Sequence, residues 1–181
     1  MMSPHYKRFL EGHANALRDK CAVPPFGRLD PFLLAQRMTV QVLMLDKSSG
    51  IPLDICDRLL GCDSRVWSAG TVHLPDGTIL VVMNPTHEIQ RQRATLMEEI
   101  AHIHLCHRPT QLIRSNGVAF RSWNKSNENQ AYWVGAAALL PERVLKGART
   151  LGMTIEDVAN EHGVSTALVR FRANLLSIKL S

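Results

Sequence analysis

Acidic and histidine side chains are concentrated in the segment 93–107. Two carboxylates and three imidazoles fall within ten consecutive positions: Glu98, Glu99, His102, His104 and His107. On a helix, at about 100° per residue, Glu98 and His102 lie one turn apart on one face, and Glu99 lies about 60° to the side of His102. Carboxylates and imidazoles arranged in this way can bind a metal ion, although a Glu-Glu pair and a His on a helix more commonly form a solvated face.

The spacing comes within one ligand of the zincin motif H-E-x-x-H, in which two histidines bind zinc and the glutamate between them is the general base. Aligning Glu99 with that glutamate places His102 at the second histidine and Glu98 at the first. Glu98 is itself a metal-binding residue type. His104 and His107 project from other sides of the helix, about 240° and 180° from Glu98, which favours structural or exposed roles for both.

A further acidic residue, Glu128, stands at the start of a predicted buried helix that ends at Pro141. An isolated glutamate in the first turn of a helix is ordinarily stabilised by the helix dipole. The local sequence therefore leaves two interpretations of Glu128 open, a first-turn residue or a ligand. Small residues along the same helix would let another helix approach closely: Ala131, Gly135, Ala136 and Ala138.

Mixed helix and strand signals position these residues. The pattern predicts helices from Ser3-Pro4 to about Lys20, after Asp30-Pro31 and over 52–60. It predicts a strand over 38–45 and a hairpin of 67–74 and 78–83 around Pro75-Asp76-Gly77. The segment 110–127 is expected to form a loop or a short edge strand. On the motif helix, Leu96, Ile100 and Ile103 form the packing stripe. The expected fold class is α+β, mostly helical, with a small antiparallel sheet packed on the motif helix.

The segment 154–172 has the helix-turn-helix pattern, with a Gly-Val-Ser turn between two predicted helices. As a DNA reader it would place Ser165 to Arg172 in the major groove, with Arg170 and Arg172 as the basic residues. Two helices that simply pack together share this signature. Because the second helix lacks a set of polar base-reading residues, packing is favoured over DNA binding.

Composition sets broad limits on the partners and location. The chain has 181 residues, 45% hydrophobic content, a formal charge of +5 and four cysteines without metal-site or disulfide-scaffold spacing. Its basic residues are scattered, so the charge gives only slight support to a nucleic-acid partner. No apolar run approaches a membrane span, and the amino terminus lacks the apolar region of a signal peptide. We therefore expect a cytoplasmic protein without a membrane partner.

Together these segments resemble the ImmA/IrrE family of gluzincin-like metallopeptidases. The resemblance covers about residues 30 to 175 and rests on three blocks in order: Arg91-Gln-Arg-Ala-Thr-Leu, Glu99-x-x-His102-x-x-Leu105-x-His107, and Glu128-x-x-Ala131 leading to Leu139-Leu140-Pro141. It implies a zincin-like fold, with a metallopeptidase-like domain over 1–150 and a helix-turn-helix-like segment, 151–181, packed on it.

The resemblance also implies roles for individual residues. His102 corresponds to the second histidine ligand, Glu128 to the third ligand and Glu99 to the general base, while Glu98 replaces the first histidine. A shell of one imidazole and two carboxylates still accepts zinc, and suits manganese or iron better than the usual two-histidine shell does. Alternatively, Glu98 points away and no metal binds stably.

The expected function is that of a cytoplasmic metal-dependent endopeptidase. The resemblance implies a protein substrate, a helix-turn-helix transcriptional repressor. The alternative is a catalytically degenerate peptidase fold that regulates a repressor by contact, or binds DNA, without hydrolysis.

Overall fold

The computed structural model describes residues 3–107, 113–115, 118–120 and 125–181. Within these residues the helices are α1 (Pro4–Asp19), α2 (Pro31–Arg37), α3 (Leu53–Leu60), α4 (Ile89–His104), α5 (Lys125–Leu139), α6 (Glu142–Thr150), α7 (Ile155–His162) and α8 (Thr166–Leu176). The strands are β1 (Val40–Met44), β2 (Ala69–His73), β3 (Ile79–Met83), β4 (Ile113–Ser115) and β5 (Val118–Phe120). The predicted α+β class is confirmed.

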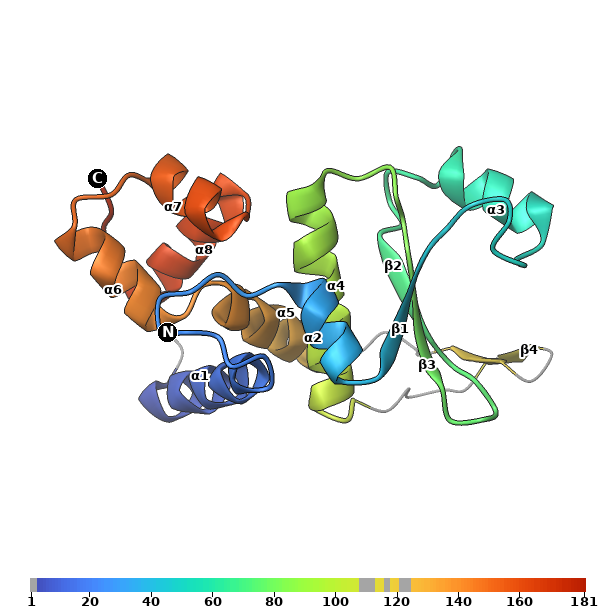
Figure 1. Ribbon diagram of the computed structural model, residues 1–181, viewed down its shortest axis with the longest axis horizontal. Helices are drawn as coiled ribbons and strands as arrows, with labels where there is room; N and C mark the ends of the chain where they lie inside the picture. The colour runs from blue at the N-terminus through green and yellow to red at the C-terminus, as the bar shows by residue number, and fades with distance from the viewer. Residues whose placement is uncertain (1–2, 108–112, 116–117, 121–124) are drawn as a thin grey trace.

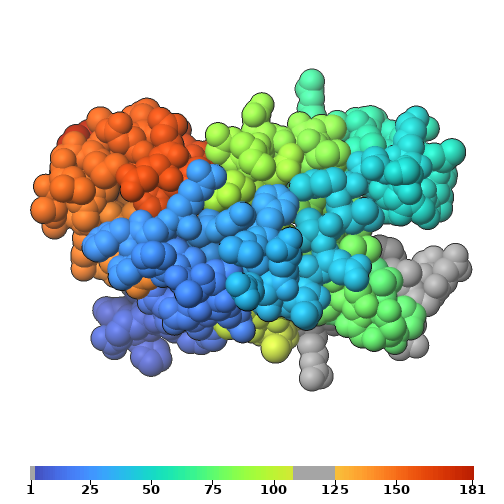
Figure 2. All heavy atoms as spheres, viewed as in Figure 1, coloured from blue at the N-terminus to red at the C-terminus, as the bar shows by residue number. Residues whose placement is uncertain are grey.

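The motif helix α4 occupies the centre of the molecule. Figure 1 shows α4 between the sheet on one side and α1 and α5–α8 on the other. Figure 2 shows the amino-terminal segment, in blue, lying across the front of the molecule between the C-terminal helices, in orange, and the strand region, in cyan and green. Among the described residues, no helix combines the length and apolar character needed to cross a membrane.

The starts of α1 and α2 follow the cap chemistry of the sequence. The Ser3 hydroxyl accepts a hydrogen bond from the Tyr6 amide at 3.2 Å, and the Asp30 carboxylate accepts one from the Phe32 amide at 3.0 Å. Proline occupies the first turn of both helices, where no amide donor is needed. The predicted helices after Ser3-Pro4 and Asp30-Pro31 are therefore confirmed.

The sheet has the strand order β1-β3-β2-β5-β4 and is mixed. The predicted hairpin is present as β2 and β3, but β1 pairs in parallel with β3, from Val40 opposite Ile79 to Met44 opposite Met83. The expectation of a purely antiparallel sheet was therefore wrong at this edge, because the partner of β1 is set by a long-range crossover through α3. In the segment 110–127, β4 and β5 form the opposite edge; residues 110–112, 116–117 and 121–124 of that prediction lie outside the described residues.

Hydrophobic packing fixes the orientation of α4 against the sheet. Leu96 and Ile100 are fully buried, and Ile103 packs partly buried against the same core, as the stripe predicted. Val81 and Met83 of β3 join this core, whereas Val82 belongs to a second cluster beneath α3. The sheet therefore separates α4 from α3.

Two buried arginines attach the C-terminal helices to the rest of the chain. Arg93 of α4 donates to the Gly163 carbonyl at 3.0 Å, in the turn between α7 and α8. Arg172 of α8 is 2% exposed, donates to the Leu140 carbonyl at 3.0 Å and forms an ion pair with Glu11. α7 and α8 thus contribute to the same hydrophobic core as α4 and α5. The predicted boundary at residue 150 falls at the end of α6.

A glycine sets the approach of α5 to α4. A Cβ atom on Gly135 would lie 3.1 Å from the carbonyl carbon and oxygen of Met97. These are backbone atoms of a buried helix, which cannot move aside as a side chain can. The small residues predicted along α5 therefore permit a close helix crossing.

Substituting Gly135 with valine is expected to force the two helices apart and to lower the free energy of unfolding by about 1–3 kcal/mol, the usual cost of overpacking. Gly12 on the exposed side of α1, where an added Cβ has nothing within 4 Å, is the matched control. Its valine variant should stay within about 0.5 kcal/mol of the parent. Urea unfolding followed by circular dichroism measures both, and equal stability of the two variants would contradict the packing argument.

Candidate metal centre

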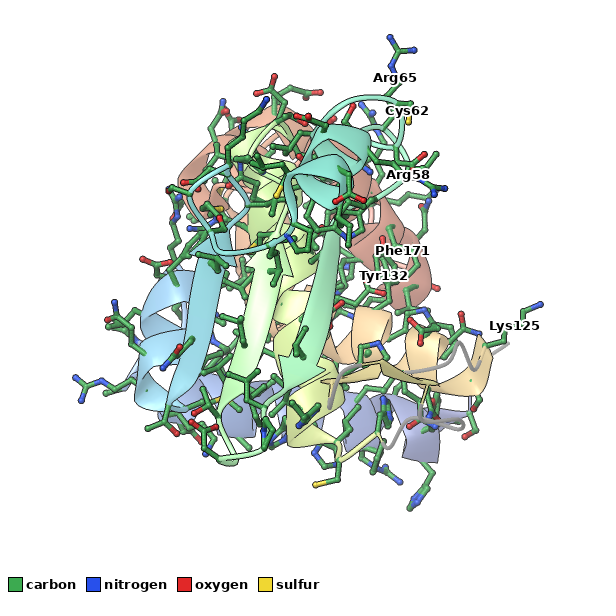
Figure 3. The ribbon with its side chains drawn as sticks, turned by 90° about the vertical axis from the view of Figure 1, so that its right-hand side faces the viewer. Arg58, Cys62, Arg65, Lys125, Tyr132 and Phe171 are labelled. Atoms are coloured by element: carbon green, nitrogen blue, oxygen red, sulfur yellow. The ribbon has the colours of Figure 1, made fainter. Side chains whose placement is uncertain are left out.

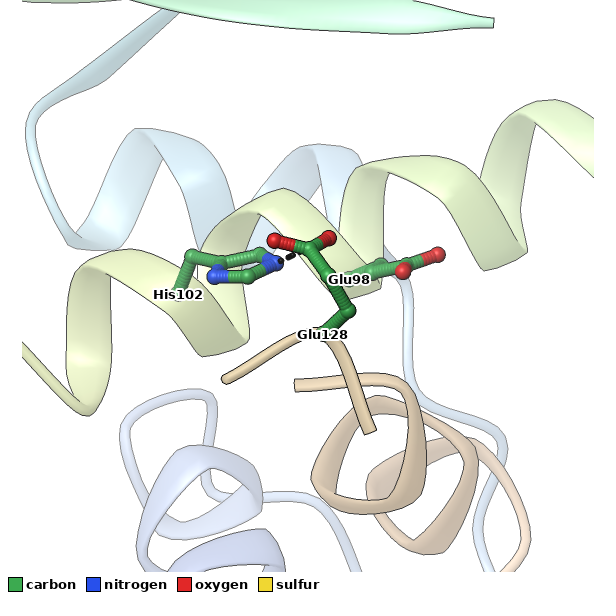
Figure 4. A group of neighbouring side chains, drawn as sticks. All are labelled: Glu98, His102 and Glu128. Carbon is green, nitrogen blue, oxygen red and sulfur yellow. Dashed lines mark ion pairs between the residues drawn. The ribbon is translucent and has the colours of Figure 1, made fainter. Parts of the chain in front are cut away.

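Three of the predicted site residues meet between α4 and the start of α5. Glu98 and His102 come from successive turns of α4, and Glu128 comes from the first turn of α5. One donor atom from each lies within 4.8 Å of the others, and His102 Nε2 is 3.3 Å from Glu128 Oε2. Figure 4 shows the ion pair between His102 and Glu128, with Glu98 beside them on α4. The structure therefore brings Glu98 and Glu128, 30 positions apart in the sequence, into one group with His102.

The imidazole of His102 is held by a second histidine. His102 Nδ1 lies 2.9 Å from Nδ1 of His107, and His107 Nε2 lies 3.3 Å from Oε1 of Gln130. An amide oxygen can only accept, so His107 carries its proton on Nε2 and accepts at Nδ1. With both imidazoles in their neutral form, His102 donates from its own Nδ1, which leaves the Nε2 lone pair directed toward Glu128 Oε2. Metal-binding histidines are typically oriented by such a partner.

The position of His107 differs from its expected place on the motif helix. α4 ends at His104, and Cys106 adopts a left-handed conformation with φ of 53°. The chain consequently folds back, and the His107 amide donates to the His102 carbonyl at 3.0 Å. A helical wheel extended to His107 therefore wrongly placed it on the side of the helix opposite Glu98. The sequence carries no clear signal for this turn, because a cysteine rarely adopts the left-handed conformation that favours glycine.

His104 has a separate role. Its Nε2 lies 3.0 Å from Nδ1 of His13 on α1, so the two imidazoles share one hydrogen bond. Burial, followed by the nearby His13 and Lys20, lowers the pKa of His104. Its side chain is outside the Glu98, His102 and Glu128 group, in line with the structural role expected for it.

Glu99 occupies the neighbouring side of α4 and is held from the sheet. The Thr71 hydroxyl, on β2, donates to Glu99 Oε2 at 2.5 Å. This bond fixes one carboxylate oxygen of the residue predicted to be the general base. Thr71 was missed by the sequence analysis because its contact with α4 depends on how the hairpin packs on the helix.

Tyr132 adds a phenol close to the group. It lies one turn after Glu128 on α5, and its ring packs at 4.9 Å from the ring of Phe171 on α8. Burial, together with the negative charge of Glu98, raises the pKa of Tyr132. The phenol therefore remains protonated near neutral pH and can donate a hydrogen bond. Sequence reasoning did not identify this residue.

The donor set fits a divalent cation. Two carboxylates this close repel each other, and a divalent cation between them replaces that repulsion by attraction. His102 Nε2, from a side chain only 3% exposed, supplies the neutral nitrogen donor. Such a shell would be formally neutral with a divalent ion, and oxygen-rich shells of this kind accept zinc, manganese or iron.

Comparison with known proteins identifies the family. Residues 63–174, more than half of the chain, match the Peptidase M78 family, described as the IrrE N-terminal-like domain. The chain belongs to this family. The match includes the whole of α4 and α5, and with them every residue of the candidate metal centre. The sequence-based resemblance to the ImmA/IrrE family is therefore confirmed.

The solved structures support the same fold. A Mycobacterium tuberculosis transcriptional regulator superposes with a TM-score of 0.56 at 13% sequence identity, over 92% of this chain and 46% of that one. The present chain thus spans about half the length of that regulator, and the likeness concerns the fold alone. No curated protein matches the chain significantly.

Metal binding should depend on His102 and Glu128 directly and on His107 through its hydrogen bond. Loss of a residue that hydrogen-bonds to a metal ligand typically weakens metal binding ~10–100-fold, and we expect a loss in this range for His107→Phe. His102→Ala and Glu128→Ala remove a ligand itself, so each should weaken zinc and manganese binding by more than this. Isothermal titration of metal-free protein measures all three.

Glu161→Ala, at an exposed site on α7, is the control for these titrations and should bind as the parent does. If His102→Ala or Glu128→Ala bound either metal as tightly as this control, the assignment of that ligand would be wrong.

Proposed function

We propose that this member of the Peptidase M78 family is a metal-dependent endopeptidase of the ImmA/IrrE type. One observation carries the proposal: the donor atoms of Glu98, His102 and Glu128 lie within 4.8 Å of one another, with Glu99 on the adjacent side of the same helix. This arrangement combines a cation-binding group with a carboxylate positioned as a general base. Zinc is the first choice of metal, with manganese or iron as alternatives.

The chain's own residues would divide the work of hydrolysis. A divalent ion, when bound, polarises the peptide carbonyl and lowers the pKa of water. Glu99 accepts the proton of the attacking water and then delivers it to the leaving amide nitrogen. Thr71 holds Oε2 of Glu99 at 2.5 Å, which keeps the carboxylate aligned through both transfers. His107 keeps the lone pair of His102 Nε2 directed into the group.

A helix-turn-helix transcriptional repressor is the proposed protein substrate, cleaved in the cytoplasm. The resemblance to the ImmA/IrrE family implies this class of substrate, and a similar solved structure is described as a transcriptional regulator.

A regulatory module without hydrolysis is the second candidate. The observation that favours it is Glu98, since a carboxylate in place of the first histidine donates more charge to the ion and weakens its Lewis acidity. Direct DNA reading receives less support. Arg172 is buried and paired with Glu11, and Arg170 lies 3.4 Å from Glu156. Arg172 therefore could not reach a base without breaking buried contacts, whereas the Arg170 pair is solvent-exposed and weak.

Glu99→Gln tests the proposed mechanism. Glutamine keeps the shape of the side chain but cannot take a proton, so we expect peptide cleavage to fall by about 100-fold or more while metal binding is retained. New amino termini in a proteome-derived peptide library, read by mass spectrometry with zinc or manganese added, measure the cleavage. Glu161→Gln is the control. Undiminished cleavage by Glu99→Gln would exclude this glutamate as the base.

Glu98→His tests whether Glu98 is a metal ligand. The variant restores the H-E-x-x-H pattern, so we expect preference to move from manganese toward zinc, because imidazole suits zinc better than a hard carboxylate oxygen does. Competition between the two ions, with Glu98→Gln measured alongside, gives the readout. If Glu98→His and the parent show the same zinc-to-manganese preference, Glu98 does not contact the ion.

A further inference from the structure

A groove opens beside the metal centre, between the amino-terminal half of α4 and the turn joining α7 to α8. Its volume is about 580 Å³, within the range typical of ligand pockets, roughly 300–1,000 Å³. One wall comes from α4, the other from the end of α7 and the first turn of α8, and Tyr132 of α5 lies between them.

The groove is continuous with the metal centre along two helices. Ala94, on its α4 wall, lies one turn before Glu98, and Tyr132 lies one turn after Glu128. In Figure 3, Tyr132 and Phe171 lie next to each other between α5 and the C-terminal helices. A chain bound across the metal centre would therefore run into this groove.

The chemistry of the groove favours an apolar side chain. Its lining is mostly apolar: carbon groups come from Ala94, Ala159, Val164, Ala167, Leu168 and the Tyr132 ring, and the uncharged polar side chains are Gln90, Asn160, Ser165 and Thr166. The charged residues, Glu88 and Arg91, are exposed at the rim and have opposite signs. Burying a charged side chain inside such a surface would be costly, whereas an apolar one would gain by leaving water.

The walls of the groove are fixed before any ligand arrives. Arg93 donates to the Gly163 carbonyl at 3.0 Å and so ties the α7–α8 turn to α4. At the rim, Arg91 donates to Ser68 Oγ at 2.9 Å. A preformed site of this kind avoids much of the entropy cost of ordering loops on binding.

We propose that this groove binds an apolar side chain of the peptide substrate, next to the bond that is cleaved. The link to the cleaved bond rests on the proposed endopeptidase function, whereas binding of the peptide does not require hydrolysis. The first turn of α8, which a DNA-binding helix-turn-helix protein would place in the major groove, here forms one wall of the peptide site.

Peptide selection on an inactive protein tests the proposal. A random linear-peptide library is displayed on phage and selected on zinc-loaded Glu99→Gln protein, and the affinities of synthetic versions are measured by fluorescence polarisation. The selected peptides should share an apolar residue at one position. Replacing that residue with serine should weaken binding by about tenfold or more, the loss expected when an apolar side chain no longer fills its pocket.

Two exposed alanines provide matched variants in the Glu99→Gln background. Ala167 faces the groove from α8, whereas Ala16 lies on the exposed side of α1. Ala167→Trp fills the groove and Ala167→Asp adds a charge to it, so both should weaken peptide binding by about tenfold or more. Ala16→Trp and Ala16→Asp should leave it unchanged, and thermal melts confirm that all four variants are folded.

Several outcomes would overturn the proposal: no enriched peptides, no shared apolar position, or equal effects of the Ala167 and Ala16 variants. If duplex DNA displaced the bound peptide, and Ala167→Asp abolished DNA binding, the groove would be assigned to nucleic acid instead. A failure of the proposed endopeptidase function gives a different result. The selected peptides would still bind and would still be weakened by the Ala167 variants, but protein with Glu99 intact would cleave none of them.

Discussion

The close crossing of α4 and α5 is the constraint on which the rest of the structure depends. At Gly135 the absence of a side chain lets α5 approach the backbone of Met97. Because the two helices are rigid, this contact sets where the start of α5 lies relative to α4. Glu128 is thereby placed 3.3 Å from His102, and Tyr132 follows it one turn later on α5. A metal centre shared by two helices therefore depends on a packing contact that contains no catalytic residue.

Buried guanidinium groups hold the helices together through hydrogen bonds to backbone carbonyls. Arg18, Arg93 and Arg172 are 0%, 5% and 2% exposed, and each donates to at least one backbone carbonyl. Burial lowers the pKa of Arg18 to about 10, which still leaves it charged at neutral pH. A planar group with five donors can satisfy several carbonyls at once, so it joins segments distant in sequence. The Arg93 contact holds the α7–α8 turn against α4, where it forms one wall of the proposed peptide site.

The chemistry of the centre depends on the balance between charge and reactivity at Glu98. A carboxylate there adds attraction for a divalent ion, yet it also reduces the Lewis acidity on which the proposed hydrolysis would rely. Two neighbouring groups position the side chains of the centre: His107 contacts the His102 imidazole, and Thr71 donates a hydrogen bond to Glu99. The two proposed functions, hydrolysis and regulatory binding, differ in the role of Glu99. Glu99 transfers a proton in the first and has no chemical role in the second.

The sequence by itself determined the starts of α1 and α2, the β2–β3 hairpin, the packing stripe of α4 and the pairing of Glu98 with His102 on one helix face. These follow from signals within a few residues, namely caps, a turn and helical periodicity. Only the tertiary structure decided the parallel partner of β1, the contact of Thr71 with Glu99 and the hydrogen bond from His102 to His107. The first two join separate elements, and the third depends on the left-handed turn at Cys106. In each case the deciding geometry is created when the chain packs, which local periodicity does not encode.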